Sequence, residues 1–345
     1  MTTLLYIVTF MVGCCLGSFA NVMGLRLLKE EEFVKTPSHC TACNTPLQWY
    51  ENIPLASWII QGGRCRSCRV LISVQYPIIE LIGGLLFVAV VSQFGTGLLN
   101  GGVESVYAAG TCLLLFFLVF NLLVILITDW RESVIFIINS LLLVPAGIIY
   151  NSLSLGAFQG IGEYSVLGLA FGLPVGLAEA LLGILAAIVV FEGLIFVSRI
   201  AFGAEGFGHG DTHLMMGVGA FLGWKLCLLA IFMGFIVQMI PAIPLLIYQW
   251  VKQKQWTPLI SGAIATLFAL LPLLFASMPA VTQSYMLYLI VTVGSIVLSL
   301  VSLFVFLKSV KQAQSFTYLP LGPALVIASL ICLYFGNQLL SIWFG

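Results

Sequence analysis

Long apolar runs separated by short polar stretches dominate this chain of 345 residues. A helix needs about 20 apolar residues to cross the roughly 30 Å of hydrocarbon in a bilayer. Such runs lie at residues 4–28, 76–94, 106–128, 133–150, 165–198, 225–249, 257–276, 285–307 and 320–342, with a shorter tenth candidate at 212–223. The pattern predicts an all-α polytopic membrane protein with about nine or ten transmembrane segments. Pro174 lies inside the run at 165–198, which we therefore expect to be bent, tilted or partly interfacial.

Composition and charge support a membrane protein and exclude two other classes. Hydrophobic residues make up 61% of the chain and charged residues only 8%, far below the roughly 25% of a water-soluble domain. The net charge is zero, so nothing indicates nucleic acid as a partner, and membrane lipid is the expected surroundings.

The basic residues sort to one side of the predicted membrane. If the N-terminus faces outward, the loops at 95–105, 151–164 and 277–284 also face outward. These three loops contain no lysine or arginine. With Lys225 as the exception, the positive-inside rule then puts the basic residues on the cytoplasmic side: Arg26, Lys29, Lys35, Arg64, Arg66, Arg69, Arg131, Arg199, Lys252, Lys254, Lys308 and Lys311.

Residues 29–75 form the only long hydrophilic excursion, and they carry two Cys-x2-Cys pairs. The pairs are Cys40 with Cys43 and Cys65 with Cys68. Two such knuckles can hold one Zn²⁺ tetrahedrally, and a closed set of four thiolates indicates a structural ion. Disulfides or unligated thiols are the alternatives, and a reducing cytoplasm disfavours disulfides. We interpret His39, next to the first pair, as a bystander.

The chain contains only two aspartates, and each lies where an apolar run meets a polar stretch. Asp129 ends one run, and Asp211 follows the closely spaced Gly208 and Gly210. An acidic residue in a membrane segment is a functional candidate by default. Two carboxylates within about 3 Å share one proton, so that one activates a water while the other protonates a carbonyl oxygen.

Structural roles are open alternatives for both aspartates. Asp129 could pair with Arg131 or cap the next helix, and Asp211 could cap a helix that begins at Thr212. His209 and His213 could tune the pair, but we favour two histidines at a wet boundary.

Several motifs in combination resemble the type IV prepilin peptidases, a family of Gly-x-Gly-Asp membrane aspartyl proteases. The amino-terminal motif is Gly17-Ser18-Phe19-Ala20-Asn21-Val22 with Arg26. The module carries Asn52-Ile53-Pro54-Leu55-Ala56-Ser57-Trp58 and Gly63-Arg64-Cys65-Arg66-Ser67-Cys68, followed by Tyr76-Pro77 and Glu80-Leu81. Downstream lie Gly208-His209-Gly210-Asp211, with Gly219, Leu222, Gly223 and Trp224, and finally Pro320-Leu321-Gly322-Pro323.

The resemblance implies a peptidase with a second activity. Asp129 and Asp211 would cut the basic leader from prepilin or pseudopilin precursors at the cytoplasmic face of the bacterial inner membrane. The amino-terminal half would then methylate the new N-terminus with S-adenosylmethionine, and Glu80, Asn21 and Arg26 are candidates for that site. Machinery that assembles type IV pili or drives type II secretion would be a further partner.

The chain also departs from the family pattern. His213 stands where the family usually has a lysine, and the proline and acidic residue often found soon after the first aspartate are missing. Two interpretations compete with a prepilin peptidase. One is a related intramembrane protease with another substrate, although such relatives lack the cysteine pairs. The other is a proton-coupled transporter with relay carboxylates, although we find no internal repeat.

The sequence predicts five parts. A first transmembrane helix (1–28) precedes the zinc module (29–75), which is followed by a membrane protease core (76–250). An apparent insertion of two helices (251–312) separates this core from a carboxy-terminal transmembrane helix (313–345).

Overall fold

The fold is taken from a computed structural model, which describes ten stretches of the chain. These are residues 2–32, 37–156, 164–166, 169–171, 175–202, 208–254, 256–257, 260–261, 264 and 320–344. The chain divides into two compact units, Met1–Val237 with Pro320–Gly345, and Gln238–Leu319. All the contacts argued below lie within the first unit.

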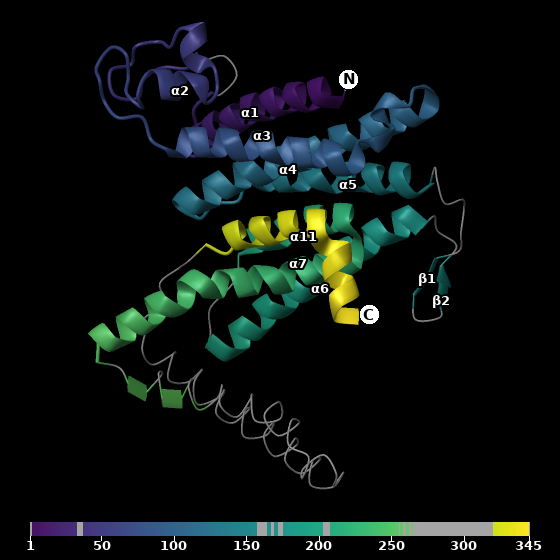
Figure 1. Cartoon of the computed structure of the whole chain (residues 1–345). Helices are drawn as coiled ribbons and strands as arrows, with labels where there is room; N and C mark the ends of the chain where they lie inside the picture. The colour runs from purple at the N-terminus through teal and green to yellow at the C-terminus, as the bar shows by residue number, and fades with distance from the viewer. Residues whose placement is uncertain are drawn as a thin grey trace, which may run out of the picture. The chain divides into compact units, whose positions relative to one another are not determined.

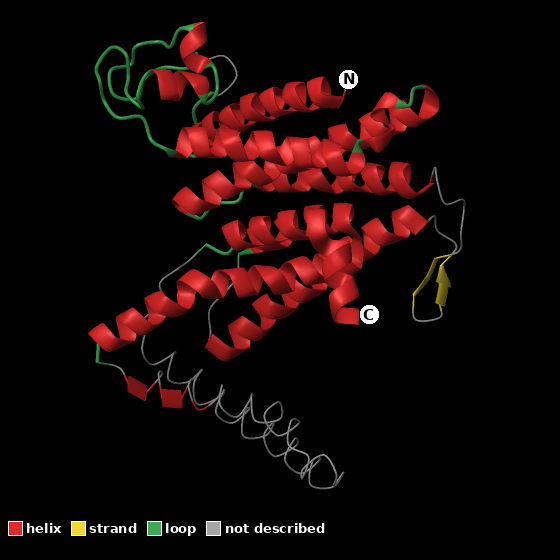
Figure 2. Cartoon of the chain, in the orientation of Figure 1, coloured by secondary structure: helices red, strands yellow, loops and turns green. Residues whose placement is uncertain are grey.

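Helices make up almost all of the described secondary structure (Figures 1 and 2). In chain order the elements are α1 (Thr2–Leu27), η1 (Trp49–Asn52), α2 (Ala56–Ile60), α3 (Gln75–Phe94), η2 (Thr96–Leu99), α4 (Gly102–Glu132), α5 (Ile137–Gly156), β1 (Tyr164–Val166), β2 (Leu169–Phe171), α6 (Val175–Phe202), α7 (His209–Lys252) and α11 (Gly322–Phe344).

Six described helices, α1, α3, α4, α6, α7 and α11, are long and apolar enough to cross a membrane. A shorter apolar helix, Ile137–Leu153, corresponds to the predicted segment at 133–150. The predicted count of nine or ten is therefore not confirmed, and the segments predicted at 257–276 and 285–307 lie almost entirely outside the described residues.

Three of the predicted apolar runs need correction. The run at 165–198 is not one long helix, because β1 and β2 pair as an antiparallel hairpin and α6 begins only at Val175. The 28 residues of α6 already span about 42 Å at roughly 1.5 Å per residue, so the start of the run is not needed for crossing. The runs at 212–223 and 225–249 join into α7, which is interrupted at Gly223, where φ is 74°.

Glycines let α1 and α3 pack with their backbones in contact. A Cβ built on Gly13 would lie 2.7 Å from the carbonyl oxygen of Gly83, and one on Gly17 would lie 2.8 Å from that of Ile79. Neither helix could accept a side chain at these positions without moving apart. Small residues four apart are a common way to pack helices in lipid, where apolar burial alone does not drive association.

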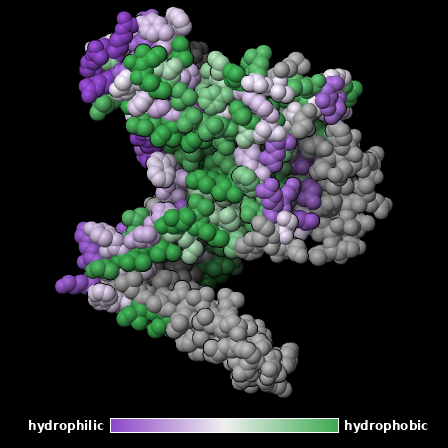
Figure 3. Space-filling view, in the orientation of Figure 1, coloured by the Kyte–Doolittle hydropathy of each residue, from purple (hydrophilic) through white to green (hydrophobic). Residues whose placement is uncertain are grey.

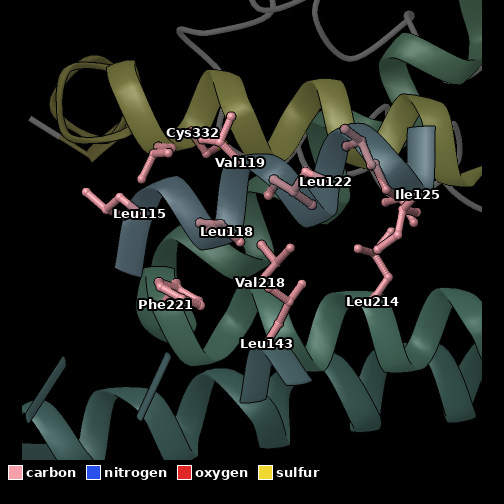
Figure 4. Packing of buried hydrophobic residues seen from close by; sticks show 14 of the residues in the cluster. Leu115, Leu118, Val119, Leu122, Ile125, Leu143, Leu214, Val218, Phe221 and Cys332 are labelled. Carbon is pink, nitrogen blue, oxygen red and sulfur yellow. The ribbon is translucent and has the colours of Figure 1, made fainter. Parts of the chain in front are cut away.

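The core is centred on α4, which contacts α1, α3, α5 and α11. Figure 4 shows α4 residues facing side chains from α5, α7 and α11. The side chains of Leu115, Leu122, Leu143 and Leu214 are at most 1% exposed. Because α4 lies at the centre of this packing, its carboxyl-terminal end is held by several neighbours.

The interruption of α7 is satisfied by a side chain from α5. Asn151 donates hydrogen bonds to the carbonyl oxygens of Ala220 (2.6 Å) and Phe221 (3.0 Å), which lie three and two residues before Gly223. A helix break inside a membrane protein requires such a partner, because lipid offers no hydrogen bonds to freed backbone groups.

The surface shown in Figure 3 has hydrophobic and hydrophilic regions. Hydrophobic residues cover much of the helices, whereas hydrophilic residues gather over the module that contains α2. Large apolar side chains such as Leu4 (64% exposed), Leu113 (66%) and Phe196 (65%) point away from the core. These exposures suit helices surrounded by lipid.

Candidate functional site

Asp129 lies in the last turn of α4, and its side chain is buried, with the residue only 4% exposed. The helix ends at Ser133, which has a φ of 54° and donates its N–H to the carbonyl oxygen of Asp129 at 2.9 Å. A residue in the left-handed backbone conformation commonly ends a helix. The alternative pairing of Asp129 with Arg131 is not among the described salt bridges, and Arg131 instead donates a hydrogen bond to Oε1 of Gln75.

Asp211 lies in the first turn of α7 and is 8% exposed. Its backbone N–H donates to the carbonyl oxygen of Gly208 at 3.1 Å, and the backbone of Gly208 also hydrogen-bonds the Asp211 carboxylate. An acidic side chain in this turn that reaches back to the start of the helix is half of a capping box. The helix begins at His209. This start is three residues earlier than Thr212, the start considered in the capping alternative.

The helix ends that carry Asp129 and Asp211 meet around one residue. Ile135 connects the two sides of the site. A Cβ built on Gly210 would lie 3.0 Å from Ile135 Cβ, and one on Gly322 would lie 3.2 Å from Ile135 Cδ1. The structure therefore brings together the two aspartates that the sequence singled out, from the ends of α4 and α7.

The start of α11 completes this arrangement. A Cβ on Gly322 would lie 2.9 Å from Cγ of Asp129, so only glycine fits here without displacing the carboxylate. The backbone of Gly322 also hydrogen-bonds that carboxylate. The Pro-Leu-Gly-Pro motif around Gly322 resembles a family motif, but nothing in its spacing along the chain indicates that it reaches the acidic site.

One oxygen of Asp129 has no partner. Its Oδ2 is buried and accepts no hydrogen bond from any residue that the structure describes. Buried polar atoms are nearly always paired, so an unpaired one needs an explanation. An oxygen that receives a shared proton, a water or a substrate atom satisfies that requirement.

Glu192 of α6 approaches the same region, and sequence reasoning missed it. Its Oε1 lies 3.3 Å from Nδ1 of His209 and 3.4 Å from Oγ1 of Thr212. The signal that identified the aspartates, an acidic residue within an apolar run, applies equally to Glu192. His213 is close by in sequence, and its Nδ1 is buried without a partner among the described residues.

The four predicted cysteine ligands converge. The sulfurs of Cys40, Cys43, Cys65 and Cys68 all lie within 4.8 Å of one another. The sulfurs of Cys40 and Cys68 are 3.8 Å apart, close to the edge of about 3.8 Å in a tetrahedron with Zn–S bonds of about 2.3 Å. His39 is outside this group, since its Nδ1 lies 3.2 Å from the carbonyl oxygen of Pro37.

The two knuckles repeat one backbone pattern. In the first, Asn44 has a φ of 55° and donates to the carbonyl oxygen of Cys40 at 2.8 Å. In the second, Arg69 has a φ of 61° and donates to that of Cys65 at 3.0 Å. Hydrogen bonds from the side chain and backbone of Thr45 lower the pKa of the Cys43 thiol to about 6, whereas desolvation and the neighbouring thiols raise the pKa of Cys68 to about 11.

The three candidates for a methylation site lie close to the module but have structural partners. Glu80 Oε2 accepts the N–H of Leu55 at 2.8 Å. Asn21 is fully buried, and its Oδ1 accepts from Nε2 of Gln75 at 2.8 Å. Arg26 donates to the carbonyl oxygen of Pro37 at 3.0 Å.

An open cleft lies between α1 and the module. Its volume is about 230 Å³, and its lining consists of Cys15, Ser18, Phe19, Val22, Arg26, Ser38, Asn52 and Pro54. Of the three methylation candidates, only Arg26 belongs to this lining.

These observations define a class: a helical membrane protein with a buried acidic pair at its helix ends and a four-cysteine module. Two family models match the chain, the Bacterial Peptidase A24 N-terminal domain at residues 11–94 and the Type IV leader peptidase family at residues 112–243. The chain therefore belongs to the type IV leader peptidase family. This confirms the resemblance noted from the motifs, and α11 with Gly322 lies beyond both matched regions.

Curated relatives support the assignment. A prepilin leader peptidase/N-methyltransferase from Myxococcus xanthus is 33% identical over 219 residues, which cover 63% of this chain and 56% of the relative. One from Aeromonas hydrophila is 30% identical, covering 64% and 74%. One from Stutzerimonas stutzeri is 27% identical, covering 80% and 91%. No solved structure matches the chain.

Proposed function

We propose that this protein is a membrane aspartic peptidase that removes the leader peptide from prepilin or pseudopilin precursors. The observation that carries the proposal is the buried pair Asp129 and Asp211, held by the ends of α4 and α7 with Gly322 beside it. The family and the names of the relatives supply the substrate class. We also propose that the active site opens to the cytoplasmic face of the bacterial inner membrane, and the distribution of basic residues supports this orientation.

The proposed chemistry needs one proton shared between the two carboxylates. The ionised carboxylate removes a proton from a water, which attacks the scissile carbonyl carbon. The protonated carboxyl group donates its proton to the carbonyl oxygen, and the resulting diol then breaks its C–N bond as the amine takes a proton. The unpartnered Oδ2 of Asp129 supports this scheme, because it offers a position for the shared proton. Gly208 and Gly210 would let the substrate backbone approach closely.

The group of four cysteines fits a structural zinc ion. Its sulfurs lie within 4.8 Å of one another, and the 3.8 Å between those of Cys40 and Cys68 matches the edge of a zinc tetrahedron. A module of this size has too little apolar core to be stable alone. A four-thiolate site has no open position, so zinc would hold the module together and would not take part in cleavage.

We further propose that the amino-terminal part methylates the N-terminus that cleavage exposes. S-adenosylmethionine would supply an electrophilic methyl group when bound. The cleft beside α1 supports binding in this region, since Ser18 and Asn52 offer polar groups next to the ring of Phe19. Arg26 would line that cleft, whereas Asn21 and Glu80 would support the helices beside it through their hydrogen bonds to Gln75 and Leu55.

A single experiment separates these activities. The purified full-length protein is incubated with a model prepilin, with and without S-adenosylmethionine, and the product masses are measured. We expect loss of the leader in both samples and a gain of one methyl group only with the methyl donor. An uncut substrate in both samples would contradict the peptidase proposal. A cut but unmethylated product would contradict only the second activity.

The other intramembrane protease classes are less well supported. The matched amino-terminal domain at residues 11–94 contains the four-cysteine module, which those relatives lack. A transporter has no supporting observation among the described residues.

A further inference from the structure

Glu192 is a half-exposed acidic side chain in the middle of the mainly apolar helix α6, which also carries Glu179 near its start and Arg199 in its last turn. It lies eight residues before Ile200, the last residue of the hydrophobic part of α6, which corresponds to about 12 Å along the helix. A carboxylate at such a position is costly in lipid unless a partner or a function compensates for it. The family resemblance assigned no role to this residue.

The Glu192 carboxylate contacts one residue before Asp211 in the sequence and one residue after it. One of its oxygens, Oε1, lies 3.3 Å from His209 Nδ1 and 3.4 Å from Thr212 Oγ1. His209 precedes Asp211 by two residues, and Thr212 follows it directly. Both contacts therefore fall on the first turn of α7, the turn that carries Asp211.

Helix geometry shows what these contacts fix. Residues three apart lie on one face of a helix, so His209 and Thr212 present the same face to Glu192. Asp211 lies away from that face of the turn. Two contacts on one face set the rotation of the turn without occupying the Asp211 carboxylate.

The sequence of this turn explains why such support is useful. Gly208 and Gly210 give the backbone more conformational freedom than any other residues would, so the turn is weakly defined by its own propensity. A negative charge at the start of α7 also interacts favourably with the exposed N–H groups of that helix end.

We propose that Glu192 is a positioning residue, which clamps the first turn of α7 through His209 and Thr212 and so orients Asp211 toward Asp129. The effect on cleavage rests on the proposed peptidase function, whereas the clamp itself does not. A carboxylate misplaced by about 1 Å can slow catalysis by roughly a hundredfold, so a loosened turn should affect turnover more than substrate binding.

The kinetic test compares Glu192→Ala, which removes the acceptor, with Glu192→Gln, which keeps one oxygen as an acceptor. We expect Glu192→Ala to lower kcat for a model prepilin about tenfold with KM within about twofold, and Glu192→Gln to recover most of kcat. Val189→Ala is the control, because Val189 is 62% exposed and lies one turn away on the same helix. It should match the wild type.

A double-mutant cycle tests the partner. If Glu192 acts through His209, then Glu192→Ala combined with His209→Ala should lower kcat little further than Glu192→Ala alone. Additive losses would contradict a shared clamp. Thr212→Val removes the other contact at nearly constant volume and should lower kcat about threefold, and it provides the test if Glu192→Ala does not fold.

Hydrogen exchange provides a readout independent of cleavage. We expect the amides at residues 209–214 to exchange faster in Glu192→Ala than in the wild type, Glu192→Gln or Val189→Ala. Unchanged exchange together with unchanged kcat would overturn the proposal, as would equal acceleration in the Val189→Ala control. Faster exchange in a protein that does not cut prepilin would support the clamp and contradict the peptidase function.

Discussion

The four-cysteine module and the acidic site are assembled in opposite ways. All four cysteines lie between residues 40 and 68, and each pair is shaped by a turn that a single left-handed residue closes. The two aspartates are separated by 82 residues (129 to 211), and Gly322 is a further 111 residues along the chain. The module is thus specified locally, whereas helix packing specifies the acidic site.

This difference predicts how each region fails. Removing one sulfur from the module removes a metal ligand, and the local fold depends on that metal. Removing a group from the acidic site leaves the helices in place, because their packing depends on buried apolar residues around α4 such as Leu115 and Leu122. Damage to the module should therefore appear first as lost stability, and damage to the acidic site as lost chemistry.

The largest effect is expected from Asp129→Asn or Asp211→Asn. An amide can neither accept the proton from water nor hold the shared proton, so each change should lower the rate of cleavage by roughly 10²–10⁴-fold. The thermal transition of the purified protein should shift little, and the zinc content should not change. Cleavage of a model prepilin, followed by mass spectrometry, measures the effect.

Glu132→Gln serves as the control, because it alters an exposed carboxylate three residues beyond Asp129 on the same helix. It should retain wild-type cleavage. Near-normal activity of either aspartate variant would show that the two residues do not form a catalytic pair.

Gly322→Ala should produce the next largest loss. The added Cβ would collide with the Asp129 carboxylate, whose Cγ lies 2.9 Å from its position, so the carboxylate must move away. We expect kcat to fall by about 10- to 100-fold, because catalysis depends steeply on such alignment. Gly110→Ala adds the same methyl group to α4 where nothing lies within 4 Å, and it should leave cleavage unchanged. Equal activity of the two variants would remove Gly322 from the site.

Cys40→Ser tests the other side of the comparison. The variant should lose bound zinc and make residues 37–75 sensitive to proteolysis, while cleavage falls by less than about tenfold because the acidic site is built elsewhere. Methylation should weaken more than cleavage does. Metal analysis, limited proteolysis and product masses give the three readouts.

Dialysis of the wild type against a strong chelator should have the same effect as Cys40→Ser. Cys15→Ser is the matched control for zinc content, because this cysteine is outside the cluster. Wild-type protein that is purified without zinc yet resists proteolysis would contradict a structural role for the metal.

The sequence predicted the features that depend on local spacing or on rare residues. The cysteine pairs were recognisable because a knuckle is a local structure, and the aspartates because an acidic residue at the end of an apolar run is unusual. The break in α7 falls at Gly223, where two predicted segments met. Glu192 met the same criterion of an acidic residue in an apolar run, but it was not singled out.

Other features depend on tertiary contacts that no spacing encodes. Gly322 contacts Asp129 only because α11 packs against α4. The hairpin of β1 and β2 was predicted as part of a helix, since a short apolar run has no periodicity that separates strand from helix. The partners of Asn21 and Glu80 were also unpredictable, because Gln75 and Leu55 reach them through the folding of the module.

The smallest expected effect concerns the link between the two regions, Gln75 at the start of α3. Its Oε1 accepts from Arg131 at 2.5 Å, and its Nε2 donates to Asn21 at 2.8 Å. Arg131 lies two residues beyond Asp129, so Gln75 joins α1 and α3, which flank the module, to the end of α4. Gln75→Ala should lower cleavage only about two- to fivefold, because the bond from Arg131 that links Gln75 to α4 is exposed, and exposed polar pairs contribute little individually.

A second substitution distinguishes the effects of the two hydrogen bonds of Gln75, because it removes one bond and keeps the other. Gln75→Glu keeps an acceptor for Arg131 but has no N–H to donate to Asn21. If the link to α4 is what affects cleavage, Gln75→Glu should cut prepilin at nearly the wild-type rate while Gln75→Ala does not. If Gln75→Glu is instead as slow as Gln75→Ala, the bond to the buried Asn21 is the important one, and the packing of α1 against α3 affects the acidic site. If neither variant slows cleavage, the module and the acidic site work independently, and the contrast between them is complete.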